Sequence, residues 1–253
     1  MKQTRSVDMK AAVIAAAALG LASALGAQPT QEVQQAARAL ARAGSYSWKT
    51  TMQFGQNRAG TLTGKYANRT AVITIPFRNQ ETQVVIRGRQ RAVKTQEGWK
   101  SLAELEQEAQ QQQGPRRFMV MMLRNLAPPH WEVRRLLRAA QSVKKEGNVY
   151  SADLSAEGAR NLMSFRRRGR PGQQQQAQER EGPPAPQVEN GKGWVKFWVR
   201  DGKLQKYSFH VEGTMKFGER EFPMSRTTTV ELSKVGETKA EVPAEAKAKL
   251  QPR

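Results

Sequence analysis

Few residues in this sequence combine a reactive side chain with a neighbour that could activate it. The chain contains no cysteine and two histidines, His130 and His210. Without cysteine there is no thiolate nucleophile, thiolate metal site or disulfide. Each histidine stands alone in a helix or strand pattern, where a structural role is commoner than catalysis. Serine-hydrolase, zinc-protease, phosphate-loop and dinucleotide-binding motifs are missing. We therefore expect a protein that is not an enzyme, with no metal and no cofactor.

Positive charge is the strongest signal in the composition. The 253 residues include 42 Lys and Arg against 22 Asp and Glu, a formal net charge of +20. Such a balance favours polyanionic partners, namely nucleic acid, anionic lipid or acidic glycan. A Gly- and Gln-rich stretch carries a candidate polyanion-binding site, formed by Arg166, Arg167, Arg168 and Arg170. The segment Arg168–Pro171 also matches the core of a minor-groove AT-hook, with a solvated charged loop as the alternative.

The N-terminal segment has the pattern of a secretory signal peptide. A basic start precedes an alanine-rich apolar run, Ala11–Ala27, which is shorter than a membrane span. We expect cleavage after Gly26 or Ala27, and Met9 is an alternative start to Met1. The mature protein is then periplasmic, and without a cysteine at the cleavage point it has no lipoprotein anchor. Removing three basic and one acidic residue leaves a net charge of +18. After export, nucleic acid is not the expected partner.

The mature chain alternates between short strands and a central group of helices. A helical pattern over Thr30–Arg42 is followed by a period of two from Tyr46 to Phe54. Further short strands up to Thr95 predict an antiparallel meander. A capping box formed by Ser101 and Glu104 opens a helix, and a later helical pattern runs from about His130 to Lys145.

Strands return in the last third of the chain. The Asp201-Gly202 dipeptide predicts a hairpin with a two-residue turn. That turn would pair Trp198 with Gln205 and Trp194 with Phe209, so both tryptophans would share a face with Tyr207 and Phe209. Between about 165 and 190 the composition becomes rich in Arg, Gln and Pro, which is typical of disorder.

These patterns predict an α+β fold with three parts. Residues 1–27 form the signal peptide, and residues 28–253 form a single domain with the disordered insertion at about 165–190. Because the helices fall between two groups of strands, we expect one strongly curved antiparallel sheet with the helices in its concavity.

Several segments resemble LolA-like and LppX-like proteins. They are the late hairpin Val199–Leu204 with Tyr207–Phe209, the closing strand Thr227–Leu232, the step Val93–Trp99 before the helices, and the ending Val235–Lys239 with Val242-Pro243. The resemblance implies an unclosed β-barrel plugged by helices that binds acyl chains of lipoproteins or glycolipids and carries them across the periplasm. Related domains act as sensors of envelope stress. The family has no catalytic residues to transfer, and this chain departs from it by its Arg/Gln-rich insertion and its charge.

The resemblance implies an apolar ligand cavity lined from both the strands and the helices. Its candidate residues are Tyr46, Trp48, Met52, Phe54, Ile73, Ile75, Val84, Ile86, Met121, Met122, Tyr207, Phe209 and Val211. The Met-rich segment 118–123 fits either ordinary core packing or an adaptable pocket wall. We expect a monomer whose partner is a lipid or a lipid-modified protein, with an anionic membrane surface as a further partner. One alternative is a protein-binding sensor whose cavity is filled by its own side chains, and another is polyanion binding through the arginine cluster.

Overall fold

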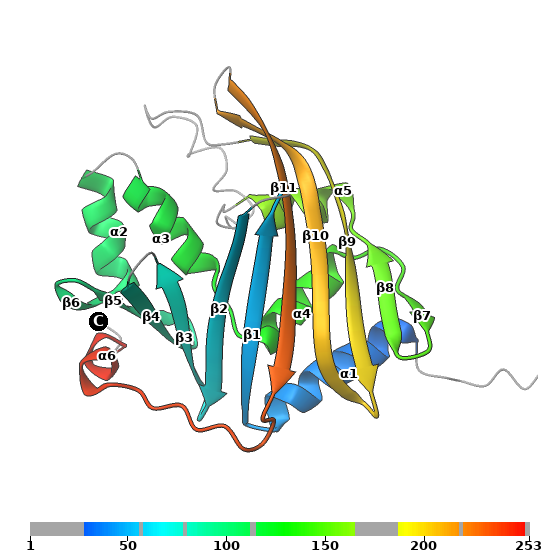
Figure 1. The fold of residues 1–253 in the computed structure, drawn as a ribbon, viewed down its shortest axis with the longest axis horizontal. Coiled ribbons are helices and arrows are strands. Elements are labelled where there is room, and N and C mark those ends of the chain that lie inside the picture. The colour runs from blue at the N-terminus through cyan, green and yellow to red at the C-terminus, as the bar shows by residue number, and fades with distance from the viewer. Residues whose placement is uncertain are drawn as a thin grey trace, which may run out of the picture.

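The computed structural model describes residues 28–55, 58–77, 80–111, 115–164, 187–217 and 220–250. The expected signal peptide and the arginine cluster lie outside the described residues. Within these ranges eleven strands form one antiparallel sheet in the order β6-β5-β4-β3-β2-β1-β11-β10-β9-β8-β7 (Figure 1). The strands are β1 (Ser45–Phe54), β2 (Arg58–Ala67), β3 (Thr70–Phe77), β4 (Gln80–Arg87), β5 (Gln90–Thr95), β6 (Gly98–Ser101), β7 (Lys144–Glu146), β8 (Val149–Asp153), β9 (Gln187–Arg200), β10 (Lys203–Phe217) and β11 (Arg220–Ser233).

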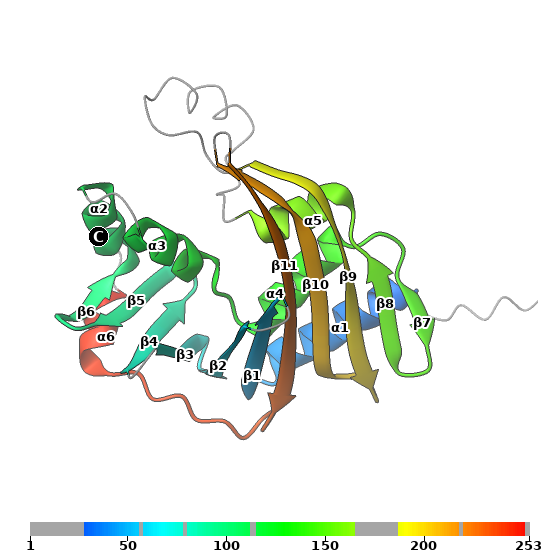
Figure 2. The same cartoon turned by 45° about the horizontal axis from the view of Figure 1, so that its top comes forward.

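Six helices accompany the sheet in the described ranges. They are α1 (Pro29–Arg42), α2 (Leu102–Gln111), α3 (Pro115–Asn125), α4 (Pro129–Ala139), α5 (Ala156–Met163) and α6 (Ala244–Lys249). The sheet is strongly curved and its end strands β6 and β7 do not pair, so it remains open (Figure 2). The predicted α+β class, with a curved open sheet and helices against it, is confirmed. None of the helices described is long and apolar enough to cross a bilayer.

Strand alternation divides the sheet into an inner and an outer face. The inner face carries α1, α4 and α5 over one half and α2 and α3 over the end formed by β4 to β6. Its side chains form the main core, in which Tyr46, Phe197 and Tyr207 are fully buried. The helix α1 is amphipathic and buries Val33 and Leu40 against this core.

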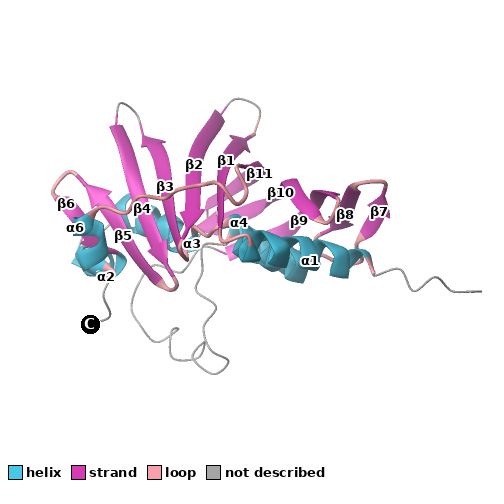
Figure 3. Cartoon of the chain, turned by 90° about the horizontal axis from the view of Figure 1, so that it is seen from below, coloured by secondary structure: helices cyan, strands magenta, loops and turns pink. Residues whose placement is uncertain are grey.

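The outer face carries the end of the chain. Residues 234–243, here called the C-terminal strap, run across β1 to β4 toward α6 (Figure 3). Helix α6 then buries Ala246 and Leu250 in a second, smaller core with Val85, Ala92 and Trp99. The strap is therefore held at its far end by apolar packing.

The predicted capping box at the start of α2 is present. The Glu104 backbone N–H donates to Ser101 Oγ at 3.2 Å, and the Ser101 backbone N–H donates to Glu104 Oε2 at 2.7 Å. Both bonds satisfy donors that a helix start leaves open. The bond from Ser101, together with Lys249 of α6, lowers the pKa of Glu104 to about 2. The carboxylate therefore joins the outer helix α6 to the first turn of α2.

The predicted register of the late hairpin was wrong. Arg200 pairs with Lys203 as expected, but a β-bulge between Leu204 and Lys206 inserts one residue into β10. Trp198 consequently pairs with Lys206, and Trp194 pairs with His210. Because a shift of one residue exchanges the faces of a strand, both tryptophans lie on the outer face, opposite Tyr207 and Phe209.

Two predicted boundaries also differ from the structure. Helix α4 ends at Ala139, not Lys145, because Ala140 has extended dihedral angles and bridges to Leu154. The chain then turns through Gly147, whose positive φ of 59° allows the tight β7–β8 hairpin. Strand β9 begins at Gln187, inside the expected disordered segment, because residues 187–189 pair with the extended end of β10. Residues 165–186 lie outside the described ranges.

The contact of Trp48 with Gly64 gives a test of core packing. The two residues face each other across β1 and β2, and a Cβ at position 64 would lie 2.1 Å from the indole. We expect Gly64→Ala to lower the free energy of unfolding by about 3 kcal/mol, as overpacked cores do. Gly60→Ala is the matched control on the same strand, because its Cβ would meet Met52 at an ordinary 3.7 Å. Urea unfolding of both variants measures the difference, and equal stabilities would contradict this account.

Candidate functional site

All eleven strand residues of the predicted cavity belong to the inner phase of their strands. Eight of them are buried in the main core, and Met52 and Ile75 pack against it while partly exposed. The eight are Tyr46, Trp48, Ile73, Val84, Ile86, Tyr207, Phe209 and Val211. Phe54, at the end of β1, is 40% exposed.

The structure does not bring the whole predicted set together. Helix α3, which carries Met121 and Met122, packs beside α2, away from α4 and α5 (Figure 1). Tyr207 and Phe209 instead belong to β10, which α1 and α5 contact. Both sets border one continuous apolar core, but between α3 and the pair α4 and α5 no described helix covers the inner face, a region here called the gap (Figure 2).

The gap lies over the inner face of β1 to β3. Exposure rises along β1 toward it, from 0% at Tyr46 and 4% at Trp48 to 40% at Phe54. Met52 and Ile75 are partly exposed near the same strand ends. Helices α2 and α3 lie on one side of these strands and α4 and α5 on the other (Figure 2).

One side of α3 exposes two methionines. Arg124 of this helix donates to Glu106 Oε1 of α2 at 2.5 and 2.9 Å, which fixes the side of α3 that faces α2. At 3.6 residues per turn, Met119 and Met122 lie on nearly the opposite side. Their exposures are 44% and 39%. The sequence analysis included Met122 and missed Met119, although their spacing of three residues is the signal for a shared helix side.

The inner face also contains a buried polar pair. The Tyr46 hydroxyl and His130 Nδ1 form a hydrogen bond of 2.5 Å, and the rings of Tyr66 and His130 meet edge to face. Burial, with Arg134 as a second cause, lowers the pKa of His130 to about 4. The imidazole is therefore neutral at pH 7. The pair positions the start of α4 on β1, which is a structural role.

A second polar group joins α4 to β10. The Tyr207 hydroxyl donates to Glu132 Oε2 at 2.6 Å, and Arg135 donates to Glu132 Oε1 at 3.1 Å. Burial and the Glu132 charge raise the pKa of Tyr207 well above its usual value. Nearby, Arg226 donates to the Leu162 carbonyl at the end of α5, where a cation interacts favourably with the helix terminus. The sequence analysis missed these contacts because partners this far apart have no local pattern.

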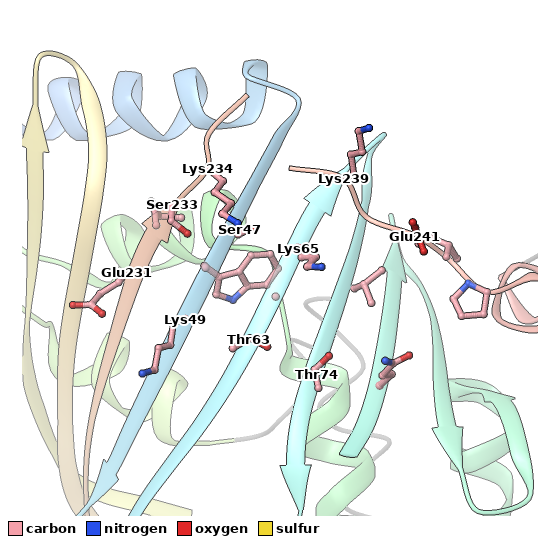
Figure 4. Close-up of a pocket in the computed structure, with 17 residues that line it drawn as sticks. Ser47, Lys49, Thr63, Lys65, Thr74, Glu231, Ser233, Lys234, Lys239 and Glu241 are labelled. Atoms are coloured by element: carbon pink, nitrogen blue, oxygen red, sulfur yellow. The ribbon is translucent and has the colours of Figure 1, made fainter. Parts of the chain in front are cut away.

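A trough with both polar and apolar lining residues lies on the outer face beneath the strap (Figure 4). It encloses about 1000 Å³ between residues of β11, β1, β2, β3 and β4 and the strap itself. Its cationic lining residues are Lys49, Lys65, Lys234 and Lys239, with Glu231 and Glu241 at its edges. Figure 4 shows Lys234 reaching from the strap back toward β1 and Lys239 pointing away from the floor. No part of the predicted apolar site suggested this trough.

The buried histidine makes stability depend on pH in a predictable direction. An unfolded His130 takes up a proton near pH 6.5, whereas the folded protein resists protonation until about pH 4. The unfolded state binds more protons between these values, so stability falls as the pH decreases. From pH 7 to pH 5 we expect a loss of about 2 kcal/mol from this residue.

Urea unfolding of His130→Gln at both pH values checks this expectation. The variant should lose about 2 kcal/mol less than the unmodified protein over that interval. His210→Gln, which removes the other histidine, is the control and should keep the full loss. Identical pH dependence in all three proteins would show that His130 is not the source.

Comparison with known proteins gave only distant structural similarity. No protein-family model and no curated protein matches the sequence. The chain is similar to a LolA superfamily protein from Nitrosomonas europaea over 83% of this chain and 93% of that one, with 7% identity and a TM-score of 0.32. It is also similar to a bifunctional dehydratase-cyclase domain of ambruticin biosynthesis, over 80% and 81%, with 14% identity and a TM-score of 0.20. The description of the fold therefore rests on the topology of the chain itself.

Proposed function

We propose that this chain is an exported, non-enzymatic protein that holds an acyl chain of a lipid or lipid-modified protein in the gap between α3 and the pair α4 and α5. One observation carries the proposal: Met119, Met122 and Phe54 are exposed, while Val120 and Leu123 of the same helix as the two methionines belong to the continuous apolar core. Isolated exposed apolar residues are common, but a group that borders an open core suggests a binding surface. The pattern at residues 1–27 supports export, and the resemblance to LolA-like proteins supports the ligand class.

The residue types in the gap suit an acyl chain. Methionine side chains are unbranched and polarisable, so they adapt to ligands of irregular shape. Each methylene removed from water contributes about 0.8 kcal/mol without any directional contact. Such a site recognises a ligand by the length and apolar area of its acyl chain, and it does not need polar side chains for specificity.

The gap is a better place for the ligand than the buried part of the predicted cavity. Eight of the predicted side chains are already packed in the main core among residues of the helices and strands. A ligand among them would have to displace a helix and break the Tyr46–His130 and Tyr207–Glu132 bonds. At the gap, exposed side chains can cover a ligand without that cost.

Charged substitutions in the gap test the proposal. We expect Met119→Glu and Met122→Glu each to reduce co-purified lipid by about tenfold, because a carboxylate on this side of α3 opposes burial of an acyl chain. Val235→Glu is the matched control, since Val235 is 43% exposed but lies in the strap on the other face. The measurement is lipid extraction and mass spectrometry of protein purified without detergent.

Two outcomes would contradict the proposal. Equal lipid in the Met119 and Met122 variants and in the control would place the ligand elsewhere. An unmodified protein with a ligand-free mass in native mass spectrometry, together with binding to a protein partner, would favour the sensor alternative.

A further inference from the structure

The trough beneath the strap contains cations without partners. Lys49, Lys65 and Lys234 form no ion pair with any residue in the described ranges. Glu231, an acidic residue of the lining, instead forms an ion pair with Lys206 of β10 at 3.6 Å. The trough therefore has a local excess of positive charge that its own carboxylates do not neutralise.

Neutral hydrogen-bonding groups lie between these cations. The lining includes the hydroxyls of Thr63, Thr74 and Ser233 and the amide of Gln83. Within the part of the chain that the structure describes, these side chains have no hydrogen-bond partner of their own. They can donate to or accept from a bound ligand without breaking a contact of the protein.

The strap holds this arrangement in place before any ligand arrives. The Gly236 backbone N–H donates to the Ser45 carbonyl at 2.8 Å, and Thr238 Oγ1 lies 2.9 Å from Ser47 Oγ. Thr238 also donates to the Lys234 carbonyl at 2.9 Å. With α6 anchored at the other end, both ends of the outer wall are fixed, which lowers the ordering cost of binding.

We propose that the trough binds an anionic saccharide, a sugar chain that carries sulfate, phosphate or carboxylate groups. Three unpaired lysines supply the cations for the charged groups, and the hydroxyl and amide side chains match the sugar hydroxyls. The volume of about 1000 Å³ is at the upper end of the range for small-ligand sites and has room for a short oligosaccharide.

The lining argues against two other ligand classes. A single-stranded nucleic acid needs exposed aromatic faces for its bases. Trp48 is the one aromatic residue of the lining, and it is 4% exposed, with its indole packed against Gly64 on the inner side. The lining also contains apolar side chains, those of Val72, Leu232, Val242 and Pro243, but an acyl chain would make no use of the lysines and hydroxyls beside them. The trough and the gap lie on opposite faces of the sheet, so this inference does not depend on the lipid proposal.

A binding measurement with a defined sulfated sugar tests the trough. The probe is a heparin-derived hexasaccharide, titrated by calorimetry at one fixed salt concentration, with maltohexaose as the uncharged sugar. We expect Lys65→Gln/Lys234→Gln to weaken hexasaccharide binding by about tenfold or more, since two charge-assisted contacts are lost. We expect maltohexaose to bind the unmodified protein far more weakly than the hexasaccharide.

The control removes the same charge elsewhere. Lys203 in the β9–β10 turn region and Lys247 in α6 are exposed and lie outside the trough lining. Lys203→Gln/Lys247→Gln should weaken binding by no more than about threefold, the effect of net charge alone. All four lysines are exposed, so thermal unfolding of both double variants should match that of the unmodified protein.

Four results would overturn the inference. The first is equal weakening in the two double variants, which would assign binding to overall charge or to the arginine cluster. The second is equal affinity for maltohexaose, and the third is no binding of the hexasaccharide by the unmodified protein. The fourth is tighter binding of an oligothymidylate that the Lys65→Gln/Lys234→Gln variant loses, which would make the ligand a nucleic acid.

Discussion

Eight residue pairs join β1 to β11, from Ser47 with Ser233 to Phe54 with Arg226. This pairing unites a strand near the start of the described residues with one near their end. Strands β2 to β6 extend the sheet on one side and β10 to β7 on the other, so a single sheet forms only when β1 and β11 meet. Contacts between such distant segments are entropically costly to form. The helices that follow β6 must then lie against the sheet, and four of them, with α1, cover its inner face.

One buried and one partly buried hydrogen bond fix one of those helices on the sheet. His130 and Glu132 belong to the first turn of α4 and bond to Tyr46 of β1 and Tyr207 of β10. Apolar packing alone would tolerate a sliding helix, whereas buried polar groups must keep their partners. The bonds hold α4 over β1, β11 and β10 and leave α3 with its own partner, α2. The gap between α3 and α4 follows from this division of the helices.

Some features could be predicted from the sequence, because each depends on residues within a few positions of one another. They are the strands, the capping box and the set of side chains on β1 to β4 that faces the inner side of the sheet. The alternation of Tyr46, Trp48 and Met52 specifies one face whatever lies above it. The bulge at Gln205 could not be predicted, because one extra residue in a ladder leaves no local pattern. The late hairpin around Asp201-Gly202 has apolar residues on both faces of its strands, so its composition could not show which face lies toward the core. The trough could not be predicted either, since it depends on where the strap crosses the sheet.

The bulge also determines which side chains of β9 and β10 meet on the outer face. By moving β9 by one position against β10, it places Trp198 beside Lys206, whose ammonium lies 5.2 Å from the indole centre. Lys206 in turn pairs with Glu231 of β11, the residue opposite Lys49 of β1. Glu231 thus has a cationic neighbour on each side, and its ion pair with Lys206 leaves Lys49 unpaired. This ion pair lies in the β10–β11 ladder, whose register is unbroken, and the same strands present their apolar residues to the inner face. Because alternate residues serve the two faces, a substitution in the trough and one in the gap should act independently.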